Sequence, residues 1–302
     1  MTRSFAFHTL DVFTDRRFAG NQLAVVEDAD GLSSDEMQAV AREFNLSETV
    51  FLLAPRDPVN TARARIFTPR AELPFAGHPT VGAAILIAQR RAPELLARHD
   101  VVVVIEEAIG VLRCEVMRSK SGVAYAQFAL PGLPRRLGPA PPRAALAQAL
   151  SLDEQDIGFG AHEPTRFAAG PSFLFAPLRS QDALSRARRG ACFAEIVGAA
   201  DGAYLYALGE AHEATAIEAR MFANGHGIDE DPATGSAAAA FAGVAMAYER
   251  PHDGEHEIFI SQGRAMGRPS RITLRMSVAE SALEAVAIGG QAVIVSEGRL
   301  TL

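Results

Sequence analysis

The sequence predicts an α+β protein of two similar domains, each a mostly antiparallel sheet or barrel wrapped around a central apolar helix. Short runs that alternate in polarity or are rich in β-branched and aromatic residues recur along the chain, with a few helical segments between them. A strand, loop and helix pattern occurs twice, about half a chain apart. The two helices of this pattern are apolar around most of their circumference, which is typical of helices enclosed on every side.

Strand signals and helix signals can be placed along the chain in order. Strands are expected at 5–13, 22–27, 48–54, 62–67, 101–106, 110–118, 122–129, 172–178, 203–208, 215–222, 256–262, 271–277 and 285–296. Helices are expected at 33–44, 80–91, 143–151, 181–188, 192–199 and 235–248. The first helix opens with Ser33 and Glu36 at the spacing of a capping box. The short spacings between strands favour antiparallel pairing.

The repeated pattern is a strand that ends in Ala-Arg-apolar-Phe, then a loop, then Pro-x-x-Gly-small-Ala at the start of a helix. It covers 64–67 with 78–84, and again 219–222 with 231–237. The offset is 219 − 64 = 155 residues at the strand and 232 − 79 = 153 at the proline. Because the offset is about half of the 302 residues, the repeat favours two halves of similar architecture.

A domain boundary is expected near the middle of the chain. A chain of 302 residues is longer than most single cores. Residues 131–144 hold five of the seventeen prolines, which is typical of a linker. We therefore expect an N-terminal domain at 1–130, a linker at 131–144 and a C-terminal domain at 145–302, with the last strand free to cross back to the N-terminal domain.

The composition argues against several classes of partner. Lys and Arg number 29 against 36 Asp and Glu, a formal net charge of −7, and no long basic run is present, so nucleic acid and anionic membranes are not expected partners. No uncharged run reaches the ~20 apolar residues of a membrane-spanning helix, and the N-terminus lacks the apolar region of a signal peptide. Cys114 and Cys192 stand alone and are interpreted as free thiols. A soluble cytoplasmic protein is expected.

The starts of the two repeated helices are candidate anion-binding sites, because the first-turn N–H groups are free donors at the positive end of a helix. Two such starts, facing each other across a cleft, would hold an anionic small molecule from both sides. Asp231 before Pro232 is also the pattern of a plain N-cap followed by a first-turn proline. His78 before Pro79 is less easily explained that way, since histidine is a poor N-cap. The repeat alone leaves both interpretations open.

Other chemistries have weaker support. Glu48, at the start of a strand, is by itself better explained as an exposed residue or a capping partner. His226 with Asp229 and Asp231 could suggest a metal site, but these residues share one loop and no second cluster accompanies them. The motifs of serine hydrolases, phosphate-loop nucleotide hydrolases and dinucleotide-binding oxidoreductases are all missing.

The sequence resembles the phenazine-biosynthesis PhzF-like family, within the diaminopimelate epimerase-like fold. The resemblance lies in FTDRRFAGNQLAVV, AREFNLSETVFLL, RIFTPRAELPFAGHPTVGAA, RMFANGHGIDEDPATGSAAAA and ISQGRAMGRPS, which span 12–270. It implies two domains of similar fold, an active site between them, a homodimer, and proton transfer without a cofactor or metal. The substrate implied is a small anionic molecule.

The resemblance also implies roles for particular residues. Glu48 would be the acid/base that moves the proton, and His78 and Asp231 would contribute to the site. Backbone amides at Gly77, and at Gly235 and Ser236, would help to bind the substrate.

The related epimerases use two cysteines at the starts of these helices. Here His78 and Asp231 hold those places, so a two-thiol mechanism is not expected.

Three functions remain open at the level of the sequence. The leading hypothesis is an isomerase in which the carboxylate of Glu48 takes a proton from an activated carbon and returns it elsewhere in the same conjugated system. The first alternative is an epimerase or racemase of a small amino or hydroxy acid. The second is a small-molecule-binding protein without turnover. Loops 159–173 and 223–230 are candidates for specificity, and Arg166 in the first of them is either a carboxylate partner or a solvated charge.

Overall fold

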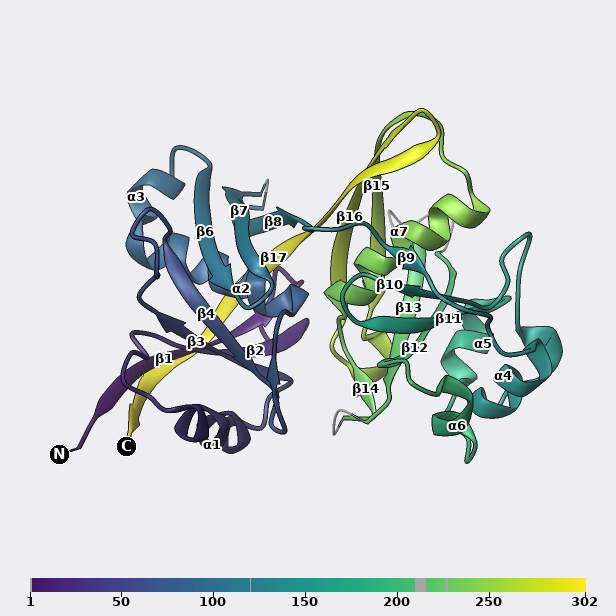
Figure 1. The fold of residues 1–302 in the computed structure, drawn as a ribbon, viewed down its shortest axis with the longest axis horizontal. Coiled ribbons are helices and arrows are strands. Elements are labelled where there is room, and N and C mark those ends of the chain that lie inside the picture. Colours follow the sequence, from purple (N-terminus) through teal and green to yellow (C-terminus); the bar gives the residue numbers. More distant parts are fainter. Residues whose placement is uncertain (1, 120, 210–215, 226–227) are drawn as a thin grey trace. The chain divides into compact units, whose positions relative to one another are not determined.

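The computed structural model describes residues 2–119, 121–209, 216–225 and 228–302, which form two compact units (Figure 1). Unit 1 comprises Met1–Pro131 and Gly289–Leu302, and unit 2 comprises Gly132–Ile288. The chain passes between the units twice. It leaves unit 1 after Pro131 and returns within the long strand β17, Ala282–Thr301, which begins in unit 2 and ends in unit 1. No helix in the described ranges has the length and apolar character needed to cross a membrane.

Unit 1 is a mixed sheet closed around one helix. Its elements are β1 (Ser4–Val12), β2 (Asn21–Val26), α1 (Ser34–Phe44), β3 (Glu48–Leu53), β4 (Ala62–Phe67), β5 (Glu72–Leu73), α2 (Gly77–Arg91), α3 (Pro93–Leu96), β6 (Val101–Glu107), β7 (Gly110–Arg118), β8 (Ala124–Ala129) and the second half of β17. The β2–β3 and β4–β6 pairs are parallel, and the other pairs with a described register are antiparallel. Helix α2 packs against β1, β2, β3, β6, β7 and β8.

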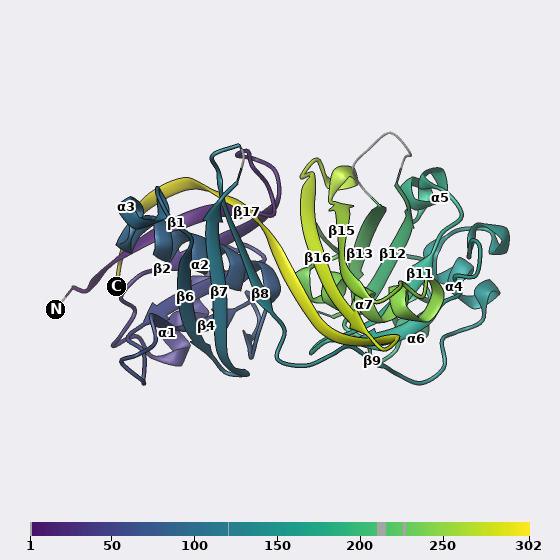
Figure 2. The same cartoon turned by 90° about the horizontal axis from the view of Figure 1, so that it is seen from above.

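Unit 2 repeats this plan (Figure 2). Its elements are β9 (Arg135–Arg136), α4 (Arg143–Leu150), a 3₁₀ turn at Glu154–Asp156, β10 (Thr165–Ala168), β11 (Ser172–Pro177), α5 (Gln181–Arg186), α6 (Phe193–Val197), β12 (Gly202–Leu208), β13 (Ile217–Ala223), β14 (Glu230–Asp231), α7 (Gly235–Tyr248), β15 (Gly254–Gln262), a 3₁₀ turn at Arg264–Met266, β16 (Ser270–Ala279) and the first half of β17. Here β11–β12 and β13–β15 are parallel. Helix α7 packs against β9, β10, β11 and β16.

The two central helices are buried because their sequences are apolar on all sides. Residues 77–88 of α2 are buried without interruption, and so is α7 from Gly235 to Ala245 apart from Ser236. Gly82 allows α2 to approach the sheet closely, since a Cβ there would lie 2.5 Å from Leu23 Cδ2 and 2.8 Å from Val12 Cγ2. The sequence prediction of two enclosed helices is confirmed. The side chains that approach Gly82 closely, Leu23 and Val12, belong to the core of unit 1.

The repeat found in the sequence is also a repeat of contacts. In β4, Arg65 forms a two-pronged ion pair with Glu72 of β5, with N···O distances of 2.7 and 2.6 Å. In β13, Arg220 pairs in the same way with Glu230 of β14, at 2.8 and 2.8 Å. Each guanidinium also lies over the phenylalanine two residues later, 5.1 Å from the ring centroid in unit 1 and 4.7 Å in unit 2.

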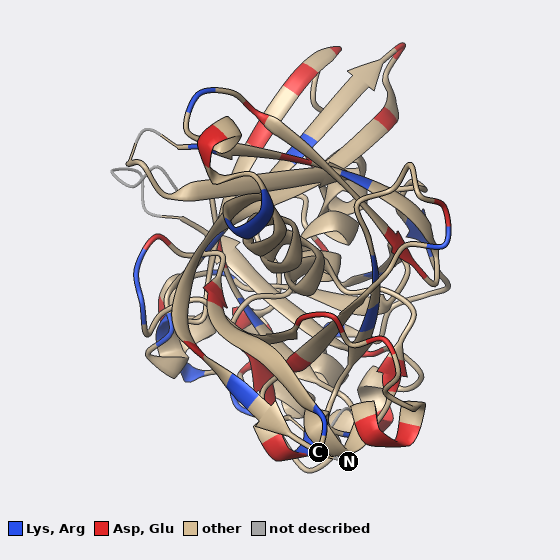
Figure 3. Ribbon diagram, turned by 90° about the vertical axis from the view of Figure 1, so that its left-hand side faces the viewer, with Lys and Arg blue, Asp and Glu red and all other residues tan. Residues whose placement is uncertain are grey.

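The predicted α+β class is confirmed, and the differences are local. The capping box of Ser33 and Glu36 is present at the start of α1. The short elements α3, β5, β9, β10 and β14 were not expected, and two of these, β9 and β10, pair with each other. Residues 131–144 contain β9 and the first residues of α4. Charged residues of both signs are interspersed along the ribbon (Figure 3).

Candidate active site

The first cluster of predicted site residues lies in unit 1, where β2, β3 and α2 meet. The parallel register places Glu48, the first residue of β3, beside Leu23 of β2. His78, in the first turn of α2, reaches across to both strands. Its Nε2 lies 3.3 Å from Glu48 Oε2 and 3.3 Å from the carbonyl oxygen of Gln22, and its Nδ1 lies 3.3 Å from Asn21 Nδ2. The Glu48 side chain is 16% exposed and that of His78 5%, so the pair is nearly dry.

The partners of His78 define its protonation state. The amide nitrogen of Asn21 can only donate, so Nδ1 of His78 is the acceptor and Nε2 carries the proton. Nε2–H then donates to the Gln22 carbonyl, and Glu48 Oε2 lies within ion-pair distance of the same nitrogen. Burial lowers the pKa of His78 to about 3, and the hydrogen bond to Gln22 opposes this only partly. His78 is therefore a neutral hydrogen-bond donor beside the carboxylate of Glu48.

The start of α2 differs from the sequence expectation. The helix begins at Gly77 with Ala76 as its N-cap, so His78 is the second helical residue and Pro79 the third. Proline is tolerated there, since the first-turn N–H groups have no intrahelical acceptor. His78 is thus not in a capping position, and its side chain is committed to β2 and β3. Gly77 contributes the first N–H of the helix, next to the His78 and Glu48 pair.

The second cluster lies in unit 2 and is centred on Asp231. Thr234 Oγ1 donates to Asp231 Oδ2 over 2.6 Å. Gln262, fully buried at the end of β15, donates from Nε2 to the carbonyl of Asp231 at 2.8 Å and to Thr234 Oγ1 at 3.1 Å, and its Oε1 accepts from the Thr234 N–H at 3.1 Å. In these hydrogen bonds the Thr234 hydroxyl is the donor to the Asp231 side chain, so this carboxylate is held as an acceptor.

The plain N-cap interpretation of Asp231 is wrong. Asp231 lies in β14, and α7 begins four residues later at Gly235 with Thr234 as its N-cap. Pro232 therefore precedes the helix, and Thr234 uses its hydroxyl on Asp231 instead of on the helix N–H groups. Gly235 and Ser236, both predicted to bind substrate, are the first two residues of α7, where N–H groups lack intrahelical acceptors.

Two residues with clear roles in this geometry were missed by sequence reasoning. Asn21 fixes the tautomer of His78, and Gln262 ties Asp231 to Thr234. Both are uncharged polar residues, fully buried at the start of β2 and at the end of β15. That pattern is readable in the sequence, because a buried polar side chain requires a partner.

Three other charged residues of unit 2 have partners in the structure. Asp229 pairs with Arg189, and Glu230 with Arg220. Arg166 donates to the carbonyl oxygens of Val197 and Ile196 at the end of α6, at 2.8 and 3.0 Å, so neither a carboxylate partner nor a solvated charge describes it.

The two cysteines are not among the contacts that define either cluster. Cys114 is buried and Cys192 half-buried, and both are free thiols. In the described ranges no group of three or more His, Cys, Asp and Glu side chains could hold a metal ion. His226, from the metal interpretation, lies outside the described residues.

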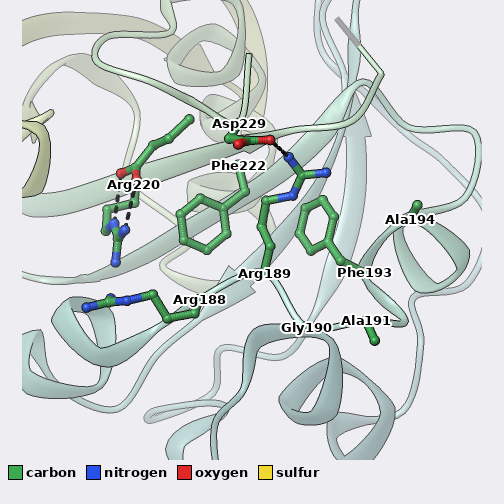
Figure 4. Close-up of a pocket in the computed structure, with 10 residues that line it drawn as sticks. Arg188, Arg189, Gly190, Ala191, Phe193, Ala194, Arg220, Phe222 and Asp229 are labelled. Atoms are coloured by element: carbon green, nitrogen blue, oxygen red, sulfur yellow. Dashed lines mark hydrogen bonds and ion pairs between the residues drawn. The ribbon is translucent and has the colours of Figure 1, made fainter. Parts of the chain in front are cut away.

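A separate cavity of about 500 Å³ lies in unit 2 (Figure 4). Its walls include the rings of Phe193 and Phe222, with centroids 6.1 Å apart. Arg189, which pairs with Asp229, lies 4.7 Å from the Phe193 centroid. None of the predicted catalytic residues lines this cavity, so it is not the candidate active site.

Comparisons with known proteins agree with the fold and the motifs. The family model described as phenazine biosynthesis-like protein, PhzC-PhzF, matches residues 10–298. An uncharacterized isomerase of Mesorhizobium japonicum is 44% identical, with 99% of each chain covered. The trans-2,3-dihydro-3-hydroxyanthranilate isomerase of Pseudomonas aeruginosa is 34% identical, over 97% of this chain and 98% of its own. The crystal structure of a PhzF-family protein from Bacillus anthracis superposes with a TM-score of 0.88 at 26% identity, covering 99% of both chains.

Proposed function

The chain belongs to the PhzC-PhzF family and is an isomerase, and from this premise we propose that it shifts a proton within a small anionic amino or hydroxy acid without a cofactor. The observation that carries the proposal is the nearly dry pair of Glu48 with a neutral His78, at 3.3 Å. A carboxylate in a desolvated setting is a stronger base than one in water, and a positioned base contributes most when its pKa lies near the working pH.

Glu48 is the proposed acid/base. Its carboxylate takes a proton from an activated carbon of the substrate, and the electrons of the broken C–H bond move into the adjoining conjugated system. The protonated Glu48 then returns the proton to another carbon of that system, so that no oxidant or reductant is needed. His78, with Nε2–H between Glu48 and the Gln22 carbonyl, keeps the carboxylate oriented toward the substrate and stays uncharged throughout.

Binding and charge stabilisation are proposed for the helix starts. The N–H of Gly77 on α2, and those of Gly235 and Ser236 on α7, are suited to a substrate carboxylate or a developing enolate. Asp231, held by Thr234 and the buried Gln262, is suited to an amino or hydroxyl group of the substrate. We propose that both half-sites act on the same substrate molecule.

The first substrate to test is suggested by the relatives. Because the Pseudomonas aeruginosa relative, 34% identical over nearly the whole chain, is named for trans-2,3-dihydro-3-hydroxyanthranilate, a cyclic dihydro-hydroxyanthranilate is the first compound to test. It carries the features that the proposal requires: a carboxylate, an amino group, a hydroxyl group and a conjugated ring.

Glu48→Gln tests the assignment, because the amide keeps the shape of the side chain and removes the proton carrier. We expect turnover to be abolished while binding of the substrate, measured by calorimetry, is retained. Glu43→Gln is the matched control, since it makes the same change at an exposed position of α1 and is expected to leave turnover unchanged. Full activity of the Glu48 variant would remove Glu48 from the mechanism.

A further inference from the structure

A buried carboxyl group outside the proposed reaction lies directly behind the start of α2. Glu107, the last residue of β6, is buried, and its Oε1 lies 2.7 Å from Thr80 Oγ1 in the first turn of α2. Thr80 Oγ1 also lies 2.8 Å from the carbonyl oxygen of Ala76, the N-cap of the helix. The network therefore joins the sheet to the peptide that opens α2.

The number of protons available to Thr80 Oγ1 determines which group donates in each of its two hydrogen bonds. A threonine hydroxyl has one proton, and a carbonyl oxygen can only accept, so Thr80 must donate to Ala76 if that contact is a hydrogen bond. The contact with Glu107 then requires a proton on the carboxyl group, which donates to Thr80. An ionised Glu107 would compete with Ala76 for the single hydroxyl proton.

The internal repeat provides independent support. In unit 1, β4 and β6 pair with Ala62 opposite Ile105, and in unit 2, β13 and β15 pair with Ile217 opposite Ile260. Both differences, 217 − 62 and 260 − 105, equal 155. Two residues further along, Glu107 therefore corresponds to Gln262 (262 − 107 = 155).

Gln262 also contacts a threonine hydroxyl in unit 2, that of Thr234, one residue past the repeat equivalent of Thr80 (80 + 153 = 233). It donates from its amide to the hydroxyl of Thr234, which in turn donates to Asp231. At the position of Glu107 the other half of the molecule thus uses a neutral donor of the same shape. A protonated glutamic acid is the closest equivalent of this glutamine.

The Ala76 carbonyl and the Gly77 N–H belong to one planar trans peptide, in which the two groups point in opposite directions. Holding the carbonyl therefore fixes the N–H. We propose that Glu107 is a positioning residue, kept as a neutral carboxylic acid that acts through Thr80 to hold the Gly77 N–H in the orientation that binds the substrate. This inference rests on the substrate-binding role proposed for Gly77.

The surroundings of Glu107 favour the neutral form. Burial raises the pKa of this carboxyl to about 8. Among the described residues no Arg, Lys or His forms an ion pair with it. On β7 the buried titratable group is Cys114, and burial raises the pKa of its thiol above the usual range.

The charged groups of the neighbouring elements lie away from Glu107. On β4, Arg63 and Arg65 alternate with the buried Ala62 and Ala64 and lie on the other face. On β7, Arg113 and Glu115 alternate with Cys114 in the same way. On α2, the titratable side chains are His78, which is neutral, and Arg90 and Arg91 in the last turn.

The experiment compares Glu107→Gln with Glu107→Leu. Glutamine can donate to Thr80 as Gln262 does to Thr234, so the first variant is expected to keep the wild-type kcat/KM near neutral pH. Leucine fills similar space without a donor and is expected to lower kcat/KM about tenfold to a hundredfold. The effect is no larger than that of removing one oxyanion donor, because the Gly77 N–H would be misplaced and not removed. Thr80→Val is expected to match the leucine variant, and Thr80→Ser to restore activity.

The pH profile separates positioning from a purely structural role. Wild-type kcat/KM is expected to fall as the pH rises through about 8, because the ionised Glu107 would draw the hydrogen bond of the Thr80 hydroxyl away from the Ala76 carbonyl. The kcat/KM of Glu107→Gln is expected to stay level over the same range. Glu106→Gln is the matched control, since Glu106 accepts from Asn60 and from the N–H groups of Arg56 and Asp57 instead. It is expected to keep the wild-type alkaline fall.

A spectroscopic measurement tests the inference without any turnover. The infrared difference between wild type and Glu107→Gln is expected to contain the carbonyl band of a protonated carboxyl group at pH 7, lost as the pH rises through about 8. Absence of that band, or a Glu107→Gln variant as impaired as Glu107→Leu, would overturn the inference. If no substrate turns over but the band is present, the proposed function has failed and the protonated state of Glu107 stands.

Discussion

Replacing His78 with asparagine tests whether the histidine is neutral beside Glu48. The native pKa of about 3 lies below the unfolded value of 6.5, so the unfolded chain binds a proton at this position between these pH values and the native protein does not. The native state is therefore stabilised above pH 6.5, and the stabilisation is lost as the pH falls toward 3. By pH 4.5, two units below the unfolded pKa, the loss is about 2.7 kcal/mol at 1.36 kcal/mol per unit.

The assay is urea unfolding of wild type and His78→Asn at several pH values between 4.5 and 8. The variant has lost its contacts with Asn21 and Gln22 and is expected to be less stable throughout, so the informative quantity is the difference between the two free energies of unfolding. We expect this difference to shrink by about 2.7 kcal/mol from pH 8 to pH 4.5. A difference that grows on acidification would show that His78 is an imidazolium paired with Glu48, and the proposed donor role would be wrong.

Two further substitutions test the supports of the site. Gln262→Leu removes the acceptor of the buried Thr234 N–H and is expected to cost about 1–3 kcal/mol of stability by urea unfolding and to lower turnover; unchanged turnover would separate Gln262 from the site. Gly82→Ala places a methyl group 2.5 Å from Leu23, so thermal unfolding is expected to show a loss of about 1–3 kcal/mol. Gly132→Ala, which meets nothing within 4 Å, should change stability by less than about 0.5 kcal/mol.

The fold could be predicted largely from local patterns. Alternation and β-branched runs marked the long strands, and two helices without a polar face marked the centres of the two units. The parallel pairs, such as β2 with β3, could not be read in this way, because periodicity reports burial and not the direction of a neighbour. The two-residue strands β9 and β14 are too short to show any period.

The site was predicted in part, and the limits have physical causes. The repeat selected His78 and Asp231 and left open whether each was a site residue or a cap before a first-turn proline. In the structure Pro79 lies inside α2 and Pro232 lies outside α7, and His78 contacts Gln22 while Asp231 contacts Thr234. The contact of His78 with Gln22 joins residues 56 positions apart and leaves no local pattern, whereas Asp231 and Thr234 are three residues apart.

The same limit applies to the residues that support the site. Asn21 lies 57 residues from His78, and Gln262 lies 31 residues from Asp231. Only the rule that buried polar groups need partners could have selected them from the sequence. The sequence therefore predicts which residue types meet, and the tertiary contacts decide their orientation and charge.

The most direct test of the central claim is proton NMR of the enzyme with trans-2,3-dihydro-3-hydroxyanthranilate in deuterium oxide, with Glu48→Gln beside wild type. The account predicts that wild type moves the double-bond system and places deuterium at the carbon that receives the proton, and that Glu48→Gln does neither. Incorporation at a stereocentre with loss of optical rotation would instead indicate epimerisation. Equal incorporation by wild type and Glu48→Gln would contradict the account, because the proton would then be carried by a group other than Glu48.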